Sequence, residues 1–298
     1  MSPELHAHAQ ASSFPLLATC ALILVALVYT RGWFRQRNDP PNRLPAWRVA
    51  AFINGLFFLW IVAGSPLSAL DHNSLTVHMI NHLMLMTVVA PLILLGSPSL
   101  LLLQGLPSWL GQSAAVFFTG NRQAQSVGRL LTNPVFCWLF ATATVIAWHL
   151  PAVFNLAARS HEWHDLEYSC FIFAGLLFWL PVIQPVTGAR KRPRWSVPVY
   201  LFLATLPCDI LSAFLVFCGR VVYPSYLSAN QIFDFCALQD QQCAGALMWV
   251  FVTFAYLAPA VVITMQILSP EAAPSQQPGR HVVHPLAPQL SGSQAEVV

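Results

Sequence analysis

Two histidines one helical turn apart, His78 and His82, have the residue types and spacing that most clearly support chemistry. Side chains four positions apart share a helix face, with Cβ atoms about 5–6 Å apart, so both imidazoles can bind one ion. Met86 continues this stripe and would lie about 6 Å deeper along a regular helix. Imidazole and thioether donors favour copper, and Cu(I) in particular, over magnesium or calcium. The alternative is a pair of interfacial histidines packed against neighbouring helices.

His149 is a third candidate ligand, in the segment Trp148-His149-Leu150-Pro151. Proline disfavours helical backbone at the residue before it, so the helix should end at Leu150. This places His149 at the same depth as His78 and His82. A lone histidine at such a place is also typical of an interface residue with a satisfied hydrogen bond.

The segment HEWHDLEY, residues 161–168, carries further candidates. If a helix begins near His161, then His164, Glu167 and Tyr168 lie on one face. Glu167 would fall near the first apolar turn, where an uncompensated carboxylate is costly. It would bind metal directly or orient a liganding histidine. Alternatively, the acidic residues of this segment only stabilise the positive end of the helix dipole.

Asp240 and Gln241 precede the apolar segment CAGALMW. Aspartate is suited to a helix N-cap, and the small residues that follow allow close helix packing. Capping and packing therefore explain this motif without a metal.

Three cysteines, Cys218, Cys236 and Cys243, flank the loop before this segment. An oxidising compartment would permit a disulfide there, but the spacing does not decide the pairing.

Seven apolar stretches position these residues. Most are near the roughly 20 residues that a helix needs to cross a bilayer. They cover Phe14–Thr30, Val49–Ala63, Val77–Leu103, Pro134–Leu150, Leu166–Val182, Val197–Phe217 and Cys243–Leu268. With 56% apolar and only 8% charged residues, the composition excludes a soluble domain, and the net charge of +3 does not indicate nucleic acid binding.

Basic residues predict the orientation of these spans. Of the 14 lysines and arginines, only Arg159 and Arg220 fall on one side, and the other 12 fall in the loops and tail of the opposite side. The positive-inside rule makes that opposite side cytoplasmic, with the N-terminus outside and the C-terminus cytoplasmic. Eight of the ten histidines then lie at the outer ends of their spans, and His281 and His284 lie in the cytoplasmic tail.

The chain reads as one membrane domain over residues 14–268. An outer tail precedes it at residues 1–13, and residues 269–298 are rich in Pro, Gln, Ser and Ala, which predicts a disordered cytoplasmic tail. No internal repeat of the kind found in many transporters is evident in the sequence.

Five motifs, in order from about residue 64 to residue 267, resemble the CtaG family of bacterial cytochrome c oxidase assembly factors. They are VHMINHLMLMTVVAPLILLGSP, WHLPAVFNLA, HDLEYSCFIFAGLLFWLPV, YPSYL and DQQCAGALMW. The resemblance implies a multi-pass protein of the bacterial inner membrane with periplasmic histidines, which assembles the oxidase's copper centre. It also implies oxidase subunits and a periplasmic copper chaperone as partners. By position, the family's residues are His78, His82, His149, His164, Glu167, Asp240 and Gln241.

One position departs from the family pattern. Members typically carry a histidine directly after the glutamate, where this chain has Tyr168. The departure argues against a direct metal role at that corner and leaves His161 or His164 to compensate.

We therefore expect an all-α membrane protein of about seven helices, embedded in the lipid bilayer. It is expected to be no enzyme, and to receive or present copper at the outer face during assembly of a haem–copper oxidase. One alternative is a transporter of copper or another small solute, for which Thr205, Asp209 and Ser212 are candidate mid-membrane polar residues. Others are a di-metal oxidoreductase with histidine boxes, which normally face the cytoplasm, and a structural scaffold for oxidase subunits.

Overall fold

The fold was analysed in a computed structural model that describes residues 3–37, 44–65, 70–71, 73–184, 193, 195–227 and 235–269. His72, His281 and His284 lie outside the described residues, as does the predicted disordered tail after Ser269. The first helix begins at Pro3, within the stretch predicted to precede the first span.

All regular structure in the described part of the chain is helical, which confirms the predicted class. In chain order the elements are α1 (Pro3–Arg37), α2 (Ala46–Gly64), α3 (Leu75–Leu83), the π-helical η3 (Met84–Val89), α4 (Ala90–Leu95), α5 (Pro98–Gly105), α6 (Ser108–Gly120), α7 (Arg122–Leu131), α8 (Pro134–His149), α9 (Pro151–Ala157), α10 (His161–Ile183), α11 (Ser196–Phe217), the 3-10 turn η4 (Pro224–Tyr226) and α12 (Ala237–Leu268).

The number of helices that could cross a membrane agrees with the prediction. Six segments are long and apolar enough, and the joined α3–η3–α4 segment from Leu75 to Leu95 is one of them. A seventh is possible if α7 and α8 form one span, although they are bent by 66° at their junction. α8 alone has 16 residues, or about 24 Å at 1.5 Å per residue, which is short of the roughly 30 Å hydrocarbon core.

The third apolar stretch is shorter than predicted, because its helix ends at Leu95 instead of Leu103. At Gly96 an added Cβ would lie 2.6 Å from the Phe52 Cβ atom, and the Tyr29 hydroxyl donates to the Gly96 carbonyl at 2.7 Å. Ser97 follows in the left-handed region with φ of 50°, and Pro98 starts α5. α5 then packs against α1 instead of continuing the span.

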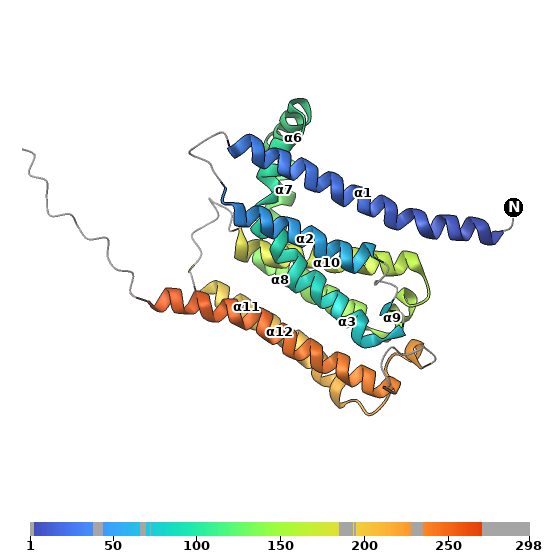
Figure 1. The fold of residues 1–298 in the computed structure, drawn as a ribbon. Helices are drawn as coiled ribbons and strands as arrows, with labels where there is room; N and C mark the ends of the chain where they lie inside the picture. The colour runs from blue at the N-terminus through green and yellow to red at the C-terminus, as the bar shows by residue number, and fades with distance from the viewer. Residues whose placement is uncertain are drawn as a thin grey trace, which may run out of the picture.

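The helices that carry the candidate ligands form the centre of the bundle. α10 packs against α8, α9, η3 and α4, and α12 packs against α3 and α11. Figure 1 shows α1 along one side, α11 and α12 along the other, and α6 and α7 projecting near the end where α1 finishes.

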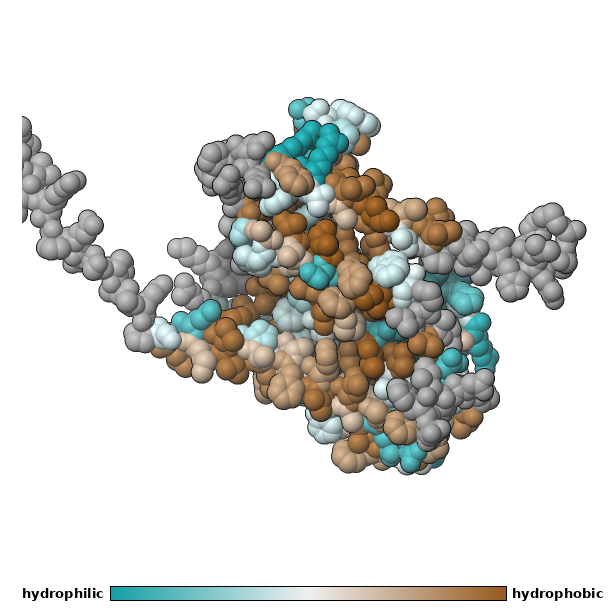
Figure 2. Space-filling model, in the orientation of Figure 1, coloured by the Kyte–Doolittle hydropathy of each residue, from teal (hydrophilic) through white to brown (hydrophobic). Residues whose placement is uncertain are grey.

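The outer surface is apolar, as a bilayer requires. Phe217 on α11 and Phe254 on α12 are 77% and 71% exposed. Hydrophobic residues cover the middle of the visible face, and hydrophilic residues gather toward its ends (Figure 2). Polar side chains near the start of α3 are instead buried between helices.

Candidate metal centre

His78 and His82 lie on one face of α3, as their spacing predicts, with ring centroids 4.3 Å apart. They are only 3% and 4% exposed, so they are buried between helices. The His82 ring stacks on Phe171 of α10 at 3.9 Å, and the His78 ring meets the edge of Phe154 of α9 at 5.1 Å. Packing therefore fixes both rings before any ligand binds.

Glu167 completes a cluster with these two histidines. Its Oε1 atom lies 3.4 Å from His82 Nε2 and 3.6 Å from His78 Nε2. The three candidate ligand atoms all lie within 4.8 Å of one another. α10 begins at His161, as predicted, and this start places Glu167 on its inward face, fully buried.

The polar atoms of this cluster lack partners. Both Glu167 oxygens, both His82 nitrogens and His78 Nε2 are buried without a hydrogen bond from any described residue. A buried polar atom without a partner costs about 1–3 kcal/mol, and a buried charge costs more. A bound cation would satisfy these atoms together, so the residues fit a metal ion.

Asp71 is a site residue that the sequence analysis missed. It lies fully buried in the turn before α3. His164 Nε2 lies 2.8 Å from Asp71 Oδ2, the Tyr168 hydroxyl donates to the same oxygen at 2.7 Å, and His78 Nδ1 is 3.9 Å away. Burial raises the pKa of Asp71, but the hydrogen bond from His164 and the nearby His78 imidazole outweigh it, so the pKa lies well below its usual range.

Asp71 therefore remains a carboxylate and forms a second cluster with His78 and His164. The two nitrogens of His78 face opposite carboxylates, because Nδ1 faces Asp71 and Nε2 faces Glu167. A ligating histidine commonly offers its other nitrogen to a carboxylate, which orients the ring. The only sequence signal for Asp71 was an acidic residue seven positions before His78. Its position does not show that the turn directs the carboxylate toward His78.

Tyr168 stands where the resemblance to the CtaG family leads us to expect a histidine. Its hydroxyl donates to Asp71 Oδ2 and accepts a hydrogen bond from Asn81 Nδ2 at 2.9 Å. The phenol therefore links α10 to the turn before α3 and orients the carboxylate. It occupies this corner as a positioning residue.

His149 ends α8, and Leu150 is the C-cap, as the following proline predicts. Its Nδ1 lies 2.7 Å from the Val145 carbonyl, which leaves Nε2 buried without a partner. The His149 ring centroid is 6.4 Å from that of His82. His149 thus reaches the same depth as His82 but belongs to neither three-residue cluster.

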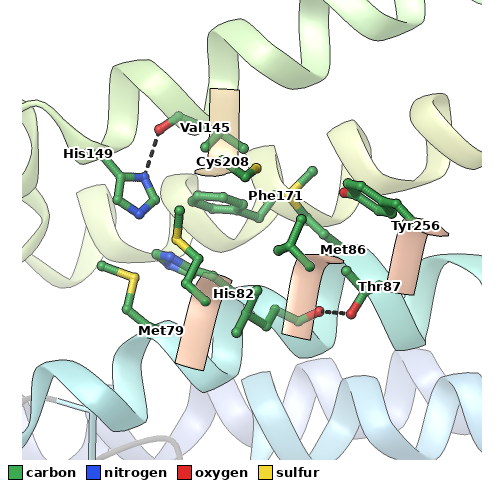
Figure 3. Close-up of a pocket in the computed structure, with 12 residues that line it drawn as sticks. Met79, His82, Met86, Thr87, Val145, His149, Phe171, Cys208 and Tyr256 are labelled. Carbon is green, nitrogen blue, oxygen red and sulfur yellow. Dashed lines mark hydrogen bonds between the residues drawn. The ribbon is translucent and has the colours of Figure 1, made fainter. Parts of the chain in front are cut away.

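His161 and Met86 lie on opposite sides of the cluster. His161 is exposed at the first residue of α10, so it does not join the buried residues. Met86 is buried in η3, one turn below His82, and both line a small cavity (Figure 3).

Asp240 caps a helix, but not its own. Its carboxylate accepts hydrogen bonds from the Ser74 hydroxyl at 2.9 Å and from the backbone N–H groups of Leu75 and Thr76 at 2.7 and 3.2 Å. Those groups open α3, whereas Cys236 is the N-cap of α12. Asp240 therefore fixes the start of the helix that carries His78 and His82.

Gln241 ties down the loop between α11 and α12. Its side chain accepts from Val222 N–H at 2.7 Å and donates to the Arg220 carbonyl at 3.1 Å. Both Asp240 and Gln241 thus have structural roles. Cys218, Cys236 and Cys243 are free thiols in the structure.

Comparisons with known proteins agree with this architecture. Uncharacterized proteins of Mycobacterium bovis and Mycobacterium tuberculosis are each 22% identical over 284 residues, which cover 90% of this chain and 41% of the relative. An uncharacterized protein of Mycobacterium leprae is 25% identical over 245 residues, which cover 79% of this chain and 36% of the relative. The chain spans less than half the length of these relatives. No solved structure matches it.

The family model of the cytochrome c oxidase caa3 assembly factors (Caa3_CtaG) matches residues 27–269. This range contains both clusters, the turn that carries Asp71 and the capping residue Asp240. The chain therefore belongs to the family of cytochrome c oxidase caa3 assembly factors.

Proposed function

We propose that this protein receives copper at the periplasmic face of the bacterial inner membrane and presents it to a cytochrome c oxidase during assembly. The observation that carries the proposal is the cluster of His78, His82 and Glu167. Its candidate ligand atoms lie within 4.8 Å of one another, are buried, and lack hydrogen bonds from the described residues.

The donor set supports copper as the ion. Imidazole nitrogens suit copper and zinc, whereas magnesium and calcium prefer oxygen ligands. Glu167 supplies a carboxylate oxygen beside the two imidazoles. Asp71 lies behind His78 and orients it, so the ligand geometry is formed in advance.

The position of the cluster supports the periplasmic assignment. It lies toward the end of the bundle where α9 and the start of α10 are found, and α6 and α7 lie toward the opposite end (Figure 1). The described arginines of that opposite end include Arg35, which donates to the carbonyls of Gln104 and Leu106, and Arg129 in the last turn of α7. Under the positive-inside rule the basic end is cytoplasmic.

The alternatives receive less support. For a transporter, Thr205 returns its hydroxyl to the Phe202 carbonyl of the same helix, and Asp209 lies at the long distance of 3.5 Å from the Thr253 hydroxyl. These described residues outline no polar path across the bundle. Membership of an assembly-factor family favours a role without turnover over a di-metal oxidoreductase.

The test replaces Glu167 with glutamine, because this change keeps the volume of the side chain and removes its charge. In a strain that depends on a caa3-type oxidase, Glu167→Gln should lower oxidase activity and the copper content of the oxidase, while this protein's own abundance stays normal. Added copper should partly restore activity, because mass action replaces a carrier. Purified Glu167→Gln protein should also bind the Cu(I) ion of this cluster at least about 100-fold more weakly, as a direct ligand is lost.

His161→Ala is the matched control, because His161 is an exposed residue of the same helix outside the cluster. It should leave copper binding and oxidase activity unchanged. Normal oxidase activity with the Glu167→Gln protein present would contradict the copper proposal. Loss of both the Glu167→Gln protein and the oxidase from the membrane would favour the scaffold alternative.

A further inference from the structure

A small cavity lies beside His82 and His149. It is lined by residues of α3, η3, α8, α10, α11 and α12 (Figure 3) and has a volume of about 20 Å³. A cavity needs roughly 10–15 Å³ to hold one water molecule. The cavity can therefore hold one water molecule or one metal ion.

Sulfur atoms are concentrated around this cavity. Four of its lining residues carry sulfur, each at most 8% exposed: Met79, Met86, Cys208 and Met248. They come from the continuous α3–η3 segment, α11 and α12, so helix periodicity relates Met79 to Met86 but does not bring Cys208 and Met248 to them. Figure 3 shows sulfur atoms beside the rings of His82 and Phe171.

The remaining polar atoms also point to a ligand. His82 has both nitrogens, and His149 has Nε2, without a hydrogen bond from any described residue, and both side chains line the cavity. The Thr87 hydroxyl, by contrast, already donates to the Leu83 carbonyl at 2.6 Å. The lining residues include no carboxylate. Neutral thioethers and imidazoles suit a soft monovalent cation such as Cu(I).

A π-helical segment fixes one of these donors. The Ala90 N–H donates to Leu85 O, five residues back, instead of to Met86 O. The Met86 carbonyl instead accepts a hydrogen bond from Trp179 Nε1 at 2.8 Å. Gly175 lets α10 approach, since an added Cβ would lie 3.0 Å from the Met86 Cα atom. Single π turns inside α-helices recur at functional sites.

We propose that this cavity is a second Cu(I) site, bound by thioether sulfur from Met86 and Met248 together with Nε2 of His149. It lies deeper in the bundle than the cluster of His78, His82 and Glu167, and His82 lies between the two sites. An ion that moves inward past His82 exchanges a carboxylate for sulfur donors. The choice of copper rests on the proposed function, but the location of the second site does not.

The test counts Cu(I) ions on the purified full-length protein, by anaerobic titration against a chromophoric Cu(I) chelator. Wild type should bind two ions per chain. The double variant Met86→Leu/Met248→Leu should bind one, and Glu167→Gln should also retain one. X-ray absorption at the copper edge should show sulfur ligands at about 2.3 Å in wild type and in Glu167→Gln. The methionine double variant should lose them.

Two further variants serve as controls for this test. Leucine nearly conserves the volume of methionine, so these changes should leave the protein folded. Met265→Leu alters a methionine on the same helix as Met248 that is 65% exposed, and should still bind two ions with sulfur ligands. If the double variant does not fold, the single variant Met86→Leu can be measured instead. It should weaken the contribution of sulfur ligands to the X-ray absorption spectrum.

Each result separates the two proposals. Unchanged stoichiometry in the methionine double variant, with only nitrogen and oxygen ligands in wild type, would overturn the second site and indicate that water fills the cavity. A methionine double variant that loses all copper would overturn two separate sites in favour of one. Sulfur-bound copper with no effect of Glu167→Gln would overturn the proposed upper cluster and leave the cavity site standing.

Discussion

At the scale of single residues, the site is organised around His78. One of its nitrogens faces Glu167 and the other faces Asp71, and both carboxylates are fully buried. Asp71 is held by His164 and Tyr168, whereas Glu167 has no hydrogen-bond donor among the described residues. The two carboxylates therefore differ, because Asp71 is hydrogen-bonded and Glu167 is the one that the proposed function assigns to the cation.

The role of Tyr168 can be tested by removing only its hydroxyl. Tyr168→Phe should weaken Cu(I) binding about 10- to 100-fold without changing the number of ions bound, since loss of an orienting partner has this size of effect. Chelator competition measures both quantities. Tyr200→Phe is the control, because it removes a hydroxyl that donates to the Phe178 carbonyl at 2.8 Å, away from the cluster. A lost ion in Tyr168→Phe would instead make the phenol a ligand.

Sequence reasoning found the histidines and Glu167, because helical spacing places them on inward faces. It did not find Asp71, which acts through contacts with residues 93 and 97 positions later. It also left open whether His78 and His82 pack against neighbouring helices, and the structure buries both between helices. Local periodicity predicts which face a side chain takes, but not what lies opposite that face.

At the scale of elements, α3 depends on a helix that is distant in sequence. Its first turn is capped by Asp240 of α12, and the π-helical η3 follows its last residue. The sequence indicated a capping aspartate but not the helix that it caps, because capping across the bundle has no local signal. The π segment was likewise unexpected, because the apolar pattern of residues 84–89 is also compatible with a regular helix.

Removing the cap should destabilise the protein. Asp240→Ala leaves buried N–H and hydroxyl donors unpaired and should lower the free energy of unfolding by about 3 kcal/mol. For a chain of this size, that corresponds to a Tm lower by about 6–12 °C. Thermal unfolding in detergent would measure the change. Asp165→Ala, at an exposed position of α10, should leave Tm within the error of the measurement. An unchanged Tm in Asp240→Ala would mean that water replaces the cap.

At the scale of the whole molecule, the helices follow the hydropathy of the sequence except where single residues intervene. The predicted number of spans is reached, but Gly96 and Ser97 end the third span early, and a 66° bend separates α7 from α8. α12 has 32 residues, or about 48 Å, and exceeds the roughly 30 Å hydrocarbon core. Its length lets it carry Asp240 to the site end of the bundle.

The orientation in the membrane follows from charge and can be measured directly. A reporter that is active only in the cytoplasm should give signal when fused after residue 190 and none when fused after residue 160. The physical reason is the concentration of basic residues on one side of the spans. Equal expression of both fusions, checked by immunoblot, is the control. The reverse pattern would place the histidine cluster in the cytoplasm and remove the periplasmic assignment.

The cap on α3 also has a consequence for the synthesis and membrane insertion of the protein. Leu75 and Asp240 are 165 residues apart, and membrane proteins, like others, are synthesised from the N-terminus. While the ribosome is still making α10 and α11, the first turn of α3 has no cap. The positions of His78 and His82 are then not fixed. Insertion of α12 supplies Asp240 and Met248 together. Under the proposed function, metal loading is therefore expected to depend on completion of the chain, and a nascent or truncated polypeptide is expected to bind copper poorly.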